Sequence, residues 1–265
     1  MESFSLLSTK IEDNKQERIA FVLDLSSEIL NEDFVTNTGD KIERLKLVFE
    51  EISSFVKLKD YFTSKPCEFA LYTYTEKLNK EIDFCELKEF DMKFSNILVT
   101  LRNKVIIPNE YLDLSSIFSE AIDTLHFSKE SVHNAHSSNK LFYSESLVRL
   151  ILFYNRSNSP AINSNDKELN TMTFIRLTNF YFDVVFMRKK INSDEDKRTL
   201  SDVYNSLKIV KTKNWYSFEI SGNYNKFKFY MNLLLANANQ RLKIADVEKH
   251  QRKIEDLAGN YIIEN

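Results

Sequence analysis

Short, uniformly apolar runs, separated by segments with apolar residues at helical spacing, restrict the fold of this chain more than any other feature. An apolar run that does not alternate with polar residues is typical of a strand buried on both faces of a parallel sheet. The apolar runs lie at 18–24, 68–75, 147–154 and 181–187. The segments with helical spacing lie at 41–57, 87–103, 115–125, 168–177 and 194–207. This alternation predicts an α/β fold with a doubly wound, mostly parallel sheet that carries helices on both faces.

Three further segments complete the predicted domain. Residues 81–84 follow the second apolar run closely enough to fold back on it as an antiparallel edge strand. Residues 215–220 are expected to form a last strand and 226–236 a closing helix. We expect one domain over 18–238, after a short N-terminal tail at 1–17.

The composition changes in residues 239–265, which are strongly charged and carry only a sparse apolar stripe. The stripe consists of Ile244, Val247, Ile254 and Leu257. Two interpretations of this tail remain open. It is either a solvated charged helix or an amphipathic segment that docks into a groove of a partner protein.

The scarcity of glycine excludes several classes of enzyme. The chain has only Gly39, Gly222 and Gly259, and no two of them lie close together. Phosphate-binding loops, dinucleotide fingerprints and the nucleophile elbow of α/β hydrolases all need glycines at close spacing. The net charge of −3, with acidic and basic residues interspersed, also argues against a nucleic-acid-binding surface. We therefore expect no cofactor and no direct contact with nucleic acid.

The chain is expected to be an intracellular protein that does not enter a membrane. No apolar stretch approaches the length that spans a bilayer, and the first residues do not resemble a secretory leader. Its two cysteines, Cys67 and Cys85, fall in strand-like segments and are too few for a disulfide framework. We interpret both as reduced thiols that behave as small apolar residues.

The segment that follows the first apolar run is the best candidate for a functional site. Ligands of open α/β sheets bind at the carboxyl ends of the strands, and this strand ends in Asp24-Leu25-Ser26-Ser27-Glu28. The sequence resembles the D-x-S-x-S loop with which von Willebrand A domains hold a divalent cation. A metal-dependent, ligand-binding von Willebrand A domain is therefore one possible interpretation.

Several departures from that pattern weaken the metal site. Glu28 replaces the second serine, Leu112 lies in the region where a threonine is expected, and Asn155 replaces an aspartate after the central strand. Arg156 adds a positive charge beside them. Because a hard cation needs a complete set of oxygen ligands, we expect no metal at this degenerate loop. We interpret Asp24 and Ser26 as residues that bind the backbone of their own loop, as a turn or a helix cap.

Other candidate sites are weaker. His133 and His136 could supply two zinc ligands, but zinc usually takes four, and the Ser/Asn-rich segment 128–140 is predicted to be a loop. A nucleophilic triad cannot be recognised from sequence because its members meet only in the fold, so an enzyme with unmarked residues remains an alternative.

Several blocks of sequence, in order along the chain, resemble one family. They are 19–28, 68–71, 148–154, 182–185 and 234–236, followed by the pair Gln240-Arg241. The family is the von Willebrand A-like scaffold subunit of the BRISC and BRCA-linked A deubiquitinase complexes. The resemblance covers about 18–241, and it includes the departure at Glu28.

The resemblance implies a non-catalytic scaffold. In that family the chain binds a BRE-type ubiquitin-E2-variant subunit and supports the integrity of the complex. Ubiquitin cleavage belongs to a separate JAMM-type metalloprotease, which is paired with an MPN-like scaffold. The complexes act in the nucleus, in DNA repair and checkpoint control, and in the cytoplasm, where they have mitotic-spindle functions. The resemblance also adds Gln240 and Arg241 to the candidate partner-binding residues of the tail.

Two features of the family have no counterpart here. Vertebrate members carry a long N-terminal extension with a tankyrase-binding motif, whereas this sequence has only 1–17 before its first predicted strand. Prolines flank the Q-R pair in the family, and none flanks Gln240-Arg241. The resemblance therefore leaves open whether a tankyrase partnership exists here and how the tail docks.

Overall fold

The centre of the protein is a six-stranded sheet with the strand order β5-β4-β1-β6-β7-β8. The computed structural model describes residues 16–63, 65–106, 112–114, 117–118, 147–159, 161, 180–208, 215–236 and 246. The strands of the sheet are β1 (Glu17–Asp24), β4 (Glu68–Tyr74), β5 (Leu78–Glu86), β6 (Leu147–Tyr154), β7 (Phe180–Met187) and β8 (Ser217–Ile220). Neighbouring strands are parallel except β5, which pairs antiparallel with β4 at one edge. The predicted α/β class, the doubly wound sheet and its antiparallel edge strand are confirmed.

The register of the central strands brings their carboxyl ends to one edge of the sheet. Ala20 of β1 lies between Ala70 of β4 and Leu150 of β6. Continuing this register places the end of β1, at Asp24, beside Tyr74 at the end of β4. The segment after β6 leaves the sheet at the same edge. Loops from three strands therefore meet around Asp24.

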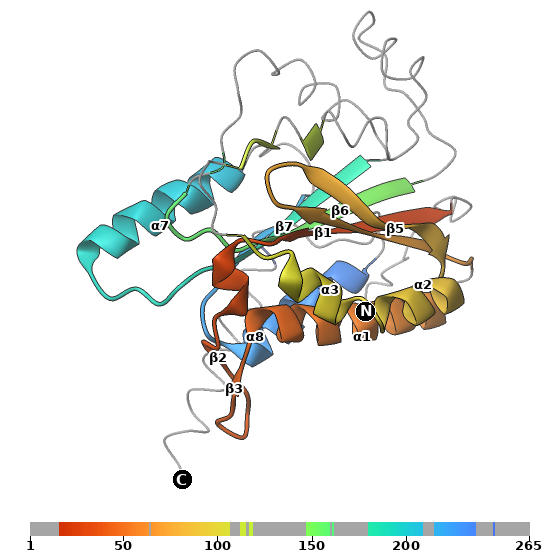
Figure 1. Cartoon of the computed structure of the whole chain (residues 1–265), viewed down its shortest axis with the longest axis horizontal. Helices are drawn as coiled ribbons and strands as arrows, with labels where there is room; N and C mark the ends of the chain where they lie inside the picture. Colours follow the sequence, from red (N-terminus) through yellow and green to blue (C-terminus); the bar gives the residue numbers. More distant parts are fainter. Residues whose placement is uncertain are drawn as a thin grey trace, which may run out of the picture.

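Helices cover both faces of this sheet (Figure 1). One face carries α1 (Arg44–Phe62), α2 (Leu87–Phe94), α3 (Leu98–Asn103) and α8 (Tyr224–Leu235), and the other carries α7 (Asp194–Leu207). A short 3-10 helix, η1 (Ser27–Leu30), follows β1, and a small hairpin of β2 (Phe34–Val35) and β3 (Lys41–Ile42) precedes α1. The hairpin projects away from the sheet in Figure 1.

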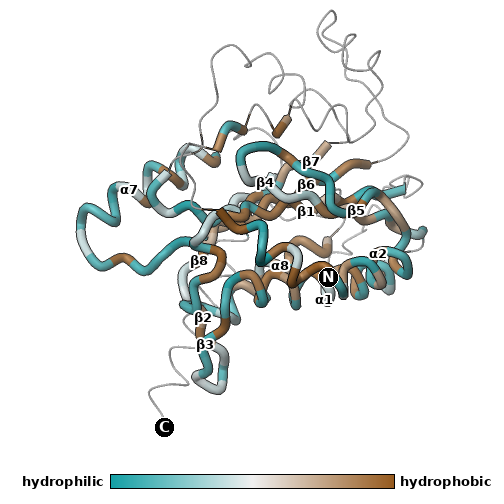
Figure 2. Tube along the Cα trace, viewed as in Figure 1, coloured by the Kyte–Doolittle hydropathy of each residue, from teal (hydrophilic) through white to brown (hydrophobic). Residues whose placement is uncertain are grey.

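Two apolar cores lie on opposite sides of the sheet because alternate strand residues point to opposite faces. Phe21 of β1 packs against Phe55 of α1 and Phe90 of α2 in the first core. In the second core, Phe182 of β7 packs against Phe118 and Trp215. Figure 2 shows that hydrophobic residues concentrate along the strands and on the sides of the helices that face them.

Two predicted helices differ from the observed ones. The helix expected at 41–57 begins at Arg44 and continues to Phe62, because residues 41–42 pair with β2 instead. The helix expected at 87–103 is two helices, α2 and α3, separated at Ser95–Ile97. Most of the expected helix at 115–125, the helix at 168–177, the loop at 128–140 and all but one residue of the tail at 239–265 lie outside the described residues.

Both cysteines are free and buried. Cys85 lies in β5, whereas Cys67 lies one residue before β4 rather than within it. Burial raises the pKa of both thiols. Among the helices that the structure describes, none is long and apolar enough to cross a membrane.

Candidate functional site

The carboxylate of Asp24 lies at the centre of the carboxyl edge of the sheet and is completely buried. The guanidinium group of Arg156, from the loop after β6, donates to Asp24 Oδ1 from both Nε and Nη2 at 3.0 Å. Arg156 Nη2 also donates to the carbonyl oxygen of Thr75, beyond the end of β4, at 3.1 Å. One arginine therefore joins the ends of three strands through a buried ion pair.

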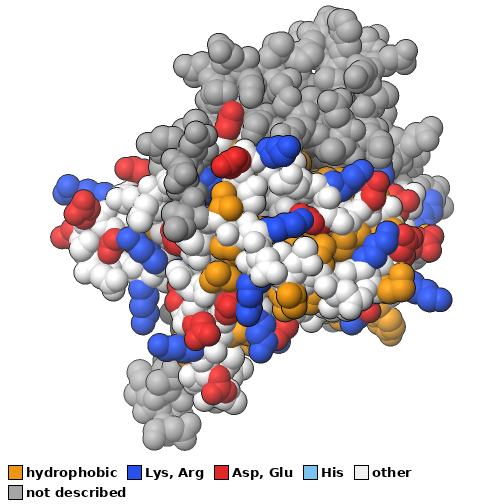
Figure 3. All heavy atoms as spheres, in the orientation of Figure 1, with side chains coloured by type: hydrophobic (Ala, Val, Ile, Leu, Met, Phe, Trp, Pro, Cys, Tyr) orange, Lys and Arg blue, Asp and Glu red, His pale blue; other side chains and the backbone are white. Residues whose placement is uncertain are grey.

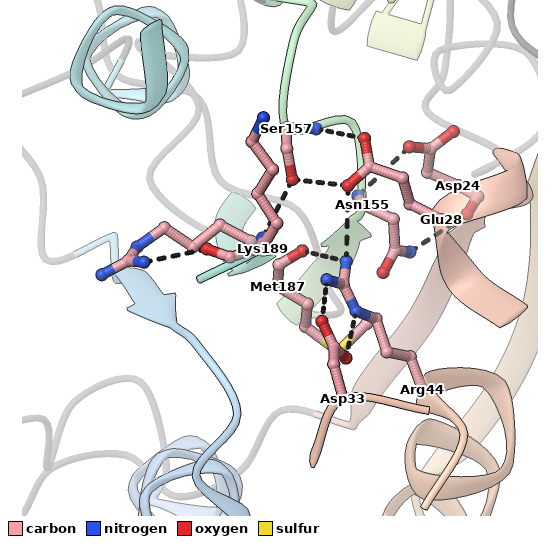
Figure 4. A network of polar contacts seen from close by, with 9 residues as sticks. Asp24, Glu28, Asp33, Arg44, Asn155, Ser157, Met187 and Lys189 are labelled. Atoms are coloured by element: carbon pink, nitrogen blue, oxygen red, sulfur yellow. Dashed lines mark hydrogen bonds and ion pairs between the residues drawn. The ribbon is translucent and has the colours of Figure 1, made fainter. Parts of the chain in front are cut away.

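Asn155 completes the contacts of Asp24. Its backbone N–H donates to Asp24 Oδ2 at 3.2 Å, and its side-chain Nδ2 donates to the Asp24 carbonyl oxygen at 3.1 Å (Figure 4). Both carboxylate oxygens of Asp24 thus accept hydrogen bonds from the segment after β6. Among the described residues, no hydrogen-bond donor reaches the buried Asn155 Oδ1 atom.

Burial raises the pKa of Asp24 above its ordinary value. Removing the carboxylate from water is the largest effect, and the charge and hydrogen bonds of Arg156 and the N–H of Asn155 oppose it. The same surroundings raise the pKa of the Tyr154 hydroxyl, chiefly through burial and then through the charge of Asp24. Charge at this edge is therefore costly unless an opposite charge is in contact with it.

A second set of polar contacts surrounds Glu28 of η1 (Figure 4). The backbone N–H of Ser157 donates to Glu28 Oε1 at 2.8 Å, and the Ser157 hydroxyl donates to Glu28 Oε2. That hydroxyl in turn accepts from the backbone N–H of Lys189, just after β7, at 3.0 Å. Glu28 therefore links η1 to the loops that follow β6 and β7.

Arg44, the first residue of α1, connects Glu28 to the rest of the fold. Its Nη1 atom lies 3.7 Å from Glu28 Oε2 and donates to the carbonyl oxygen of Met187, the last residue of β7, at 2.6 Å. Its Nε atom donates to Asp33 Oδ1 at 2.8 Å, and its Nη2 atom donates to Asp33 Oδ2. The Arg44 side chain is fully buried, so its charge is matched by two carboxylates and one carbonyl.

These contacts decide how the residues fit a divalent cation. In the arrangement described, the positive group that touches Asp24 is the Arg156 guanidinium, and Glu28 is committed to Ser157 and Arg44. No group of three or more His, Cys, Asp or Glu side chains within the described ranges could hold a metal ion. The residues present do not fit a cation-binding loop, because a guanidinium already lies against the carboxylate that would be its main ligand.

The structure brings together four residues of the predicted site: Asp24, Ser26, Glu28 and Asn155. The expectation that Asp24 and Ser26 bind the backbone of their own loop is wrong. Ser26 stands at the N-cap position of η1, but its side chain makes no capping hydrogen bond. Asp24 binds the segment after β6 instead, because its side chain points into the buried space between the two strand ends.

Of the remaining candidate residues, only Leu112 lies in the part of the chain that the structure describes. Leu112 is fully buried in the second apolar core. The candidate partner-binding residues Gln240, Arg241, Ile244, Val247, Ile254 and Leu257 lie outside the described residues, as do His133 and His136.

Sequence reasoning missed Arg44, Asp33 and Ser157. Arg44 offered the clearest signal, since it is a charged residue next to the apolar positions of an amphipathic helix. Its partners could not be identified from sequence, because Asp33 and Met187 lie 11 and 143 residues away. Only the folded sheet brings them together.

No protein-family model matches the sequence, and no curated protein matches it significantly. Solved structures with a similar fold include the VWA domain of SpRpn10, at 10% identity and a TM-score of 0.46, covering 78% of this chain and 89% of that one. A von Willebrand factor type A protein from Catenulispora acidiphila has 11% identity and a TM-score of 0.47, covering 84% of this chain and 43% of that one. The PilB minor pilin from Streptococcus sanguinis has 10% identity and a TM-score of 0.47, with coverages of 85% and 61%. This similarity concerns the fold alone, and nothing that those proteins bind is transferred to this chain.

Proposed function

We propose that this chain is a non-catalytic scaffold subunit that works by binding other proteins. The complex we propose for it is a ubiquitin-chain-specific deubiquitinase assembly of the BRISC type, which its sequence blocks resemble. Its direct partner would be a BRE-type ubiquitin-E2-variant subunit. The JAMM-type metalloprotease and its MPN-like scaffold would be indirect partners, in the cytoplasm and the nucleus.

The observation that carries the proposal is the buried Asp24–Arg156 pair. An open α/β sheet usually binds its ligand at the carboxyl edge, with polar groups that are free to contact it. Here Asp24, Glu28 and Arg156 are committed to contacts within the protein. The chemistry of the edge is therefore used to hold the strand ends together, which favours a structural role over catalysis or metal-dependent binding.

Co-expression with the E2-variant subunit tests the partner. We expect the two chains to co-purify through affinity and size-exclusion steps, and the complex to be lost or weakened when residues 237–265 are deleted. Val99→Asp is the control, because Val99 is exposed on α3 and lies outside the deleted segment. If the tail deletion left the association unchanged, the proposed contact surface would be wrong.

The enzymatic and metal-dependent alternatives have separate tests. The purified chain should leave defined ubiquitin chains uncleaved, and turnover that a single substitution abolishes would contradict the proposed role. Calorimetric titration with magnesium or manganese should give no heat of binding. Heat that Asp24→Ala removes would instead establish a working cation site.

A further inference from the structure

Helices α1 and α8 run side by side in the same direction on one face of the sheet. Lys228 Nζ of α8 lies 3.7 Å from Glu51 Oε1 of α1, and Lys59 Nζ of α1 donates to the carbonyl oxygen of Leu235, the last residue of α8, at 3.1 Å. The contacts are eight residues apart on α1 and seven on α8, so the helices stay level with each other. The end of α8 is therefore level with Lys59.

Helix α1 continues for three residues beyond that level, and it carries an apolar stripe to its end. Glu51, Phe55, Leu58 and Phe62 are spaced four, three and four residues apart, which places them on one face of the helix. Glu51 and Phe55 are 7% and 2% exposed, whereas Leu58 and Phe62 are 39% and 69% exposed. The stripe changes from buried to exposed at the point where α8 ends.

The exposed end of the stripe is larger than these two side chains. Tyr61 packs edge-on against Phe62, with ring centroids 5.3 Å apart, and is itself 81% exposed. Figure 3 shows apolar side chains among charged groups on the surface over α1. A grouped set of exposed aromatic and aliphatic side chains is typical of a surface that another segment covers.

We infer that residues 237–250 of this chain dock on the exposed end of the α1 stripe, at Leu58 and Phe62. Lys59 holds the end of α8 beside this surface, so the chain that follows Leu235 starts next to it. Ala236, with φ −58° and ψ 138°, has left the helical conformation and ends the helix there. From Lys59 to Phe62 is about 4.5 Å along α1, a distance that two extended residues can cover.

The sequence of this segment supplies the matching chemistry. Leu242, Ile244 and Val247 provide apolar side chains, and the charged residues between them can remain in water. Docking would remove the apolar groups of Leu58 and Phe62 from water, as the core already does for Phe55 two turns earlier. The inference concerns a contact within the chain and does not depend on the proposed partner. It uses Ile244 and Val247, so only Ile254 and Leu257 of the apolar stripe would remain for that partner.

Hydrogen–deuterium exchange of the full chain tests this contact. We expect amides in 237–250 to be protected in the natural chain and to exchange at least tenfold faster in the double variant Leu58→Ser, Phe62→Ser, since losing about 1.4 kcal/mol of apolar contact equals a factor of ten. The matched control is Val99→Ser with Met92→Ser, which changes two exposed apolar residues on α3 and α2. The control should leave the exchange of 237–250 unchanged.

Three outcomes would overturn the inference. The first is rapid exchange of 237–250 in the natural chain, and the second is equal exchange in the two variants. The third is a contact between copies, in which protection rises with protein concentration and sedimentation shows a dimer that Leu58→Ser, Phe62→Ser abolishes. Unchanged circular dichroism and urea midpoints in both variants establish that the fold is intact.

Discussion

At the scale of single residues, the contact between Asp24 and Arg156 joins the strand ends at the carboxyl edge of the sheet. Burying a single charge costs folding free energy, so the Asp24 carboxylate and the Arg156 guanidinium each need the opposite charge of the other. The sequence placed Asp24, Glu28 and Asn155 at one edge and identified Arg156 as unfavourable to a metal. It could not show that Arg156 contacts Asp24 directly, because 132 residues separate them and only the pairing of β1 with β6 brings them together.

Replacing the arginine tests the importance of this pair. We expect Arg156→Met to lower the free energy of unfolding by about 3–5 kcal/mol, because it leaves a buried carboxylate without its counter-charge. Arg102→Met is the matched control, since Arg102 pairs with Glu43 at the exposed surface and should cost less than about 1 kcal/mol. Urea denaturation followed by circular dichroism measures both. Equal losses in the two variants would mean that burial of the Asp24 pair has little energetic effect.

The pH dependence of stability follows from the raised pKa of Asp24. Its pKa in the folded protein lies above the value of about 3.9 in an unfolded chain, so the folded state binds this proton more tightly. The resulting stability is fully present below the unfolded pKa and is lost as the pH rises through the folded pKa. We expect the natural chain to lose unfolding free energy relative to Asp24→Asn as the pH rises from about 4. Urea titrations of both proteins at several pH values measure this relative unfolding free energy. If it rose with pH instead, the effect of Arg156 on the pKa of Asp24 would outweigh that of burial.

At the scale of helices and strands, local sequence determined most of the arrangement, and the errors have identifiable causes. The apolar periodicity over 87–103 continues through the gap between α2 and α3. At the end of α2, however, the Ser95 hydroxyl donates to the carbonyl oxygen of Asp91, and Asn96 Nδ2 donates to that of Met92. Side chains that compete for backbone carbonyls in this way weaken a helix, and hydrophobic spacing does not reveal them. The first residues of the helix expected at 41–57 pair with β2 instead, which is a tertiary effect.

Helix α7 begins with a capping arrangement that can be tested alone. Ser193 Oγ accepts from the backbone N–H of Asp196 at 3.1 Å, and Asp196 Oδ2 accepts from that of Asn192 at 3.1 Å. We expect Ser193→Ala to cost about 1 kcal/mol of stability, because unpaired N–H groups at the helix start lose an acceptor. Ser201→Ala, at an exposed position inside α7, should be neutral or slightly stabilising. The cap would have no measurable role if chemical denaturation gave the same midpoint for both.

At the scale of the whole molecule, stability should decrease from the centre of the sheet towards its edges. Strands β1 and β6 have partners on both sides and are almost completely buried, whereas β5 is an edge strand with exposed Lys80 and Asp83. We expect the slowest amide exchange in β1 and β6, faster exchange in β5, and the fastest in the hairpin of β2 and β3. Residue-resolved exchange measures this order. Protection in β5 equal to that in β1 would indicate that another segment covers the edge.

The central position of β1 also has a consequence for how the protein is made. Glu17 pairs with Leu147, so 130 residues must be synthesised before the first strand can meet its β6 neighbour. At about 5–20 residues per second, the ribosome needs roughly 7 to 26 s for that stretch. During this interval one flank of β1 can be paired by β4, while the other presents free backbone groups to the cell. The nascent chain is then an unfinished half-sheet with an apolar edge, and this is the stage at which a chaperone has the most to protect.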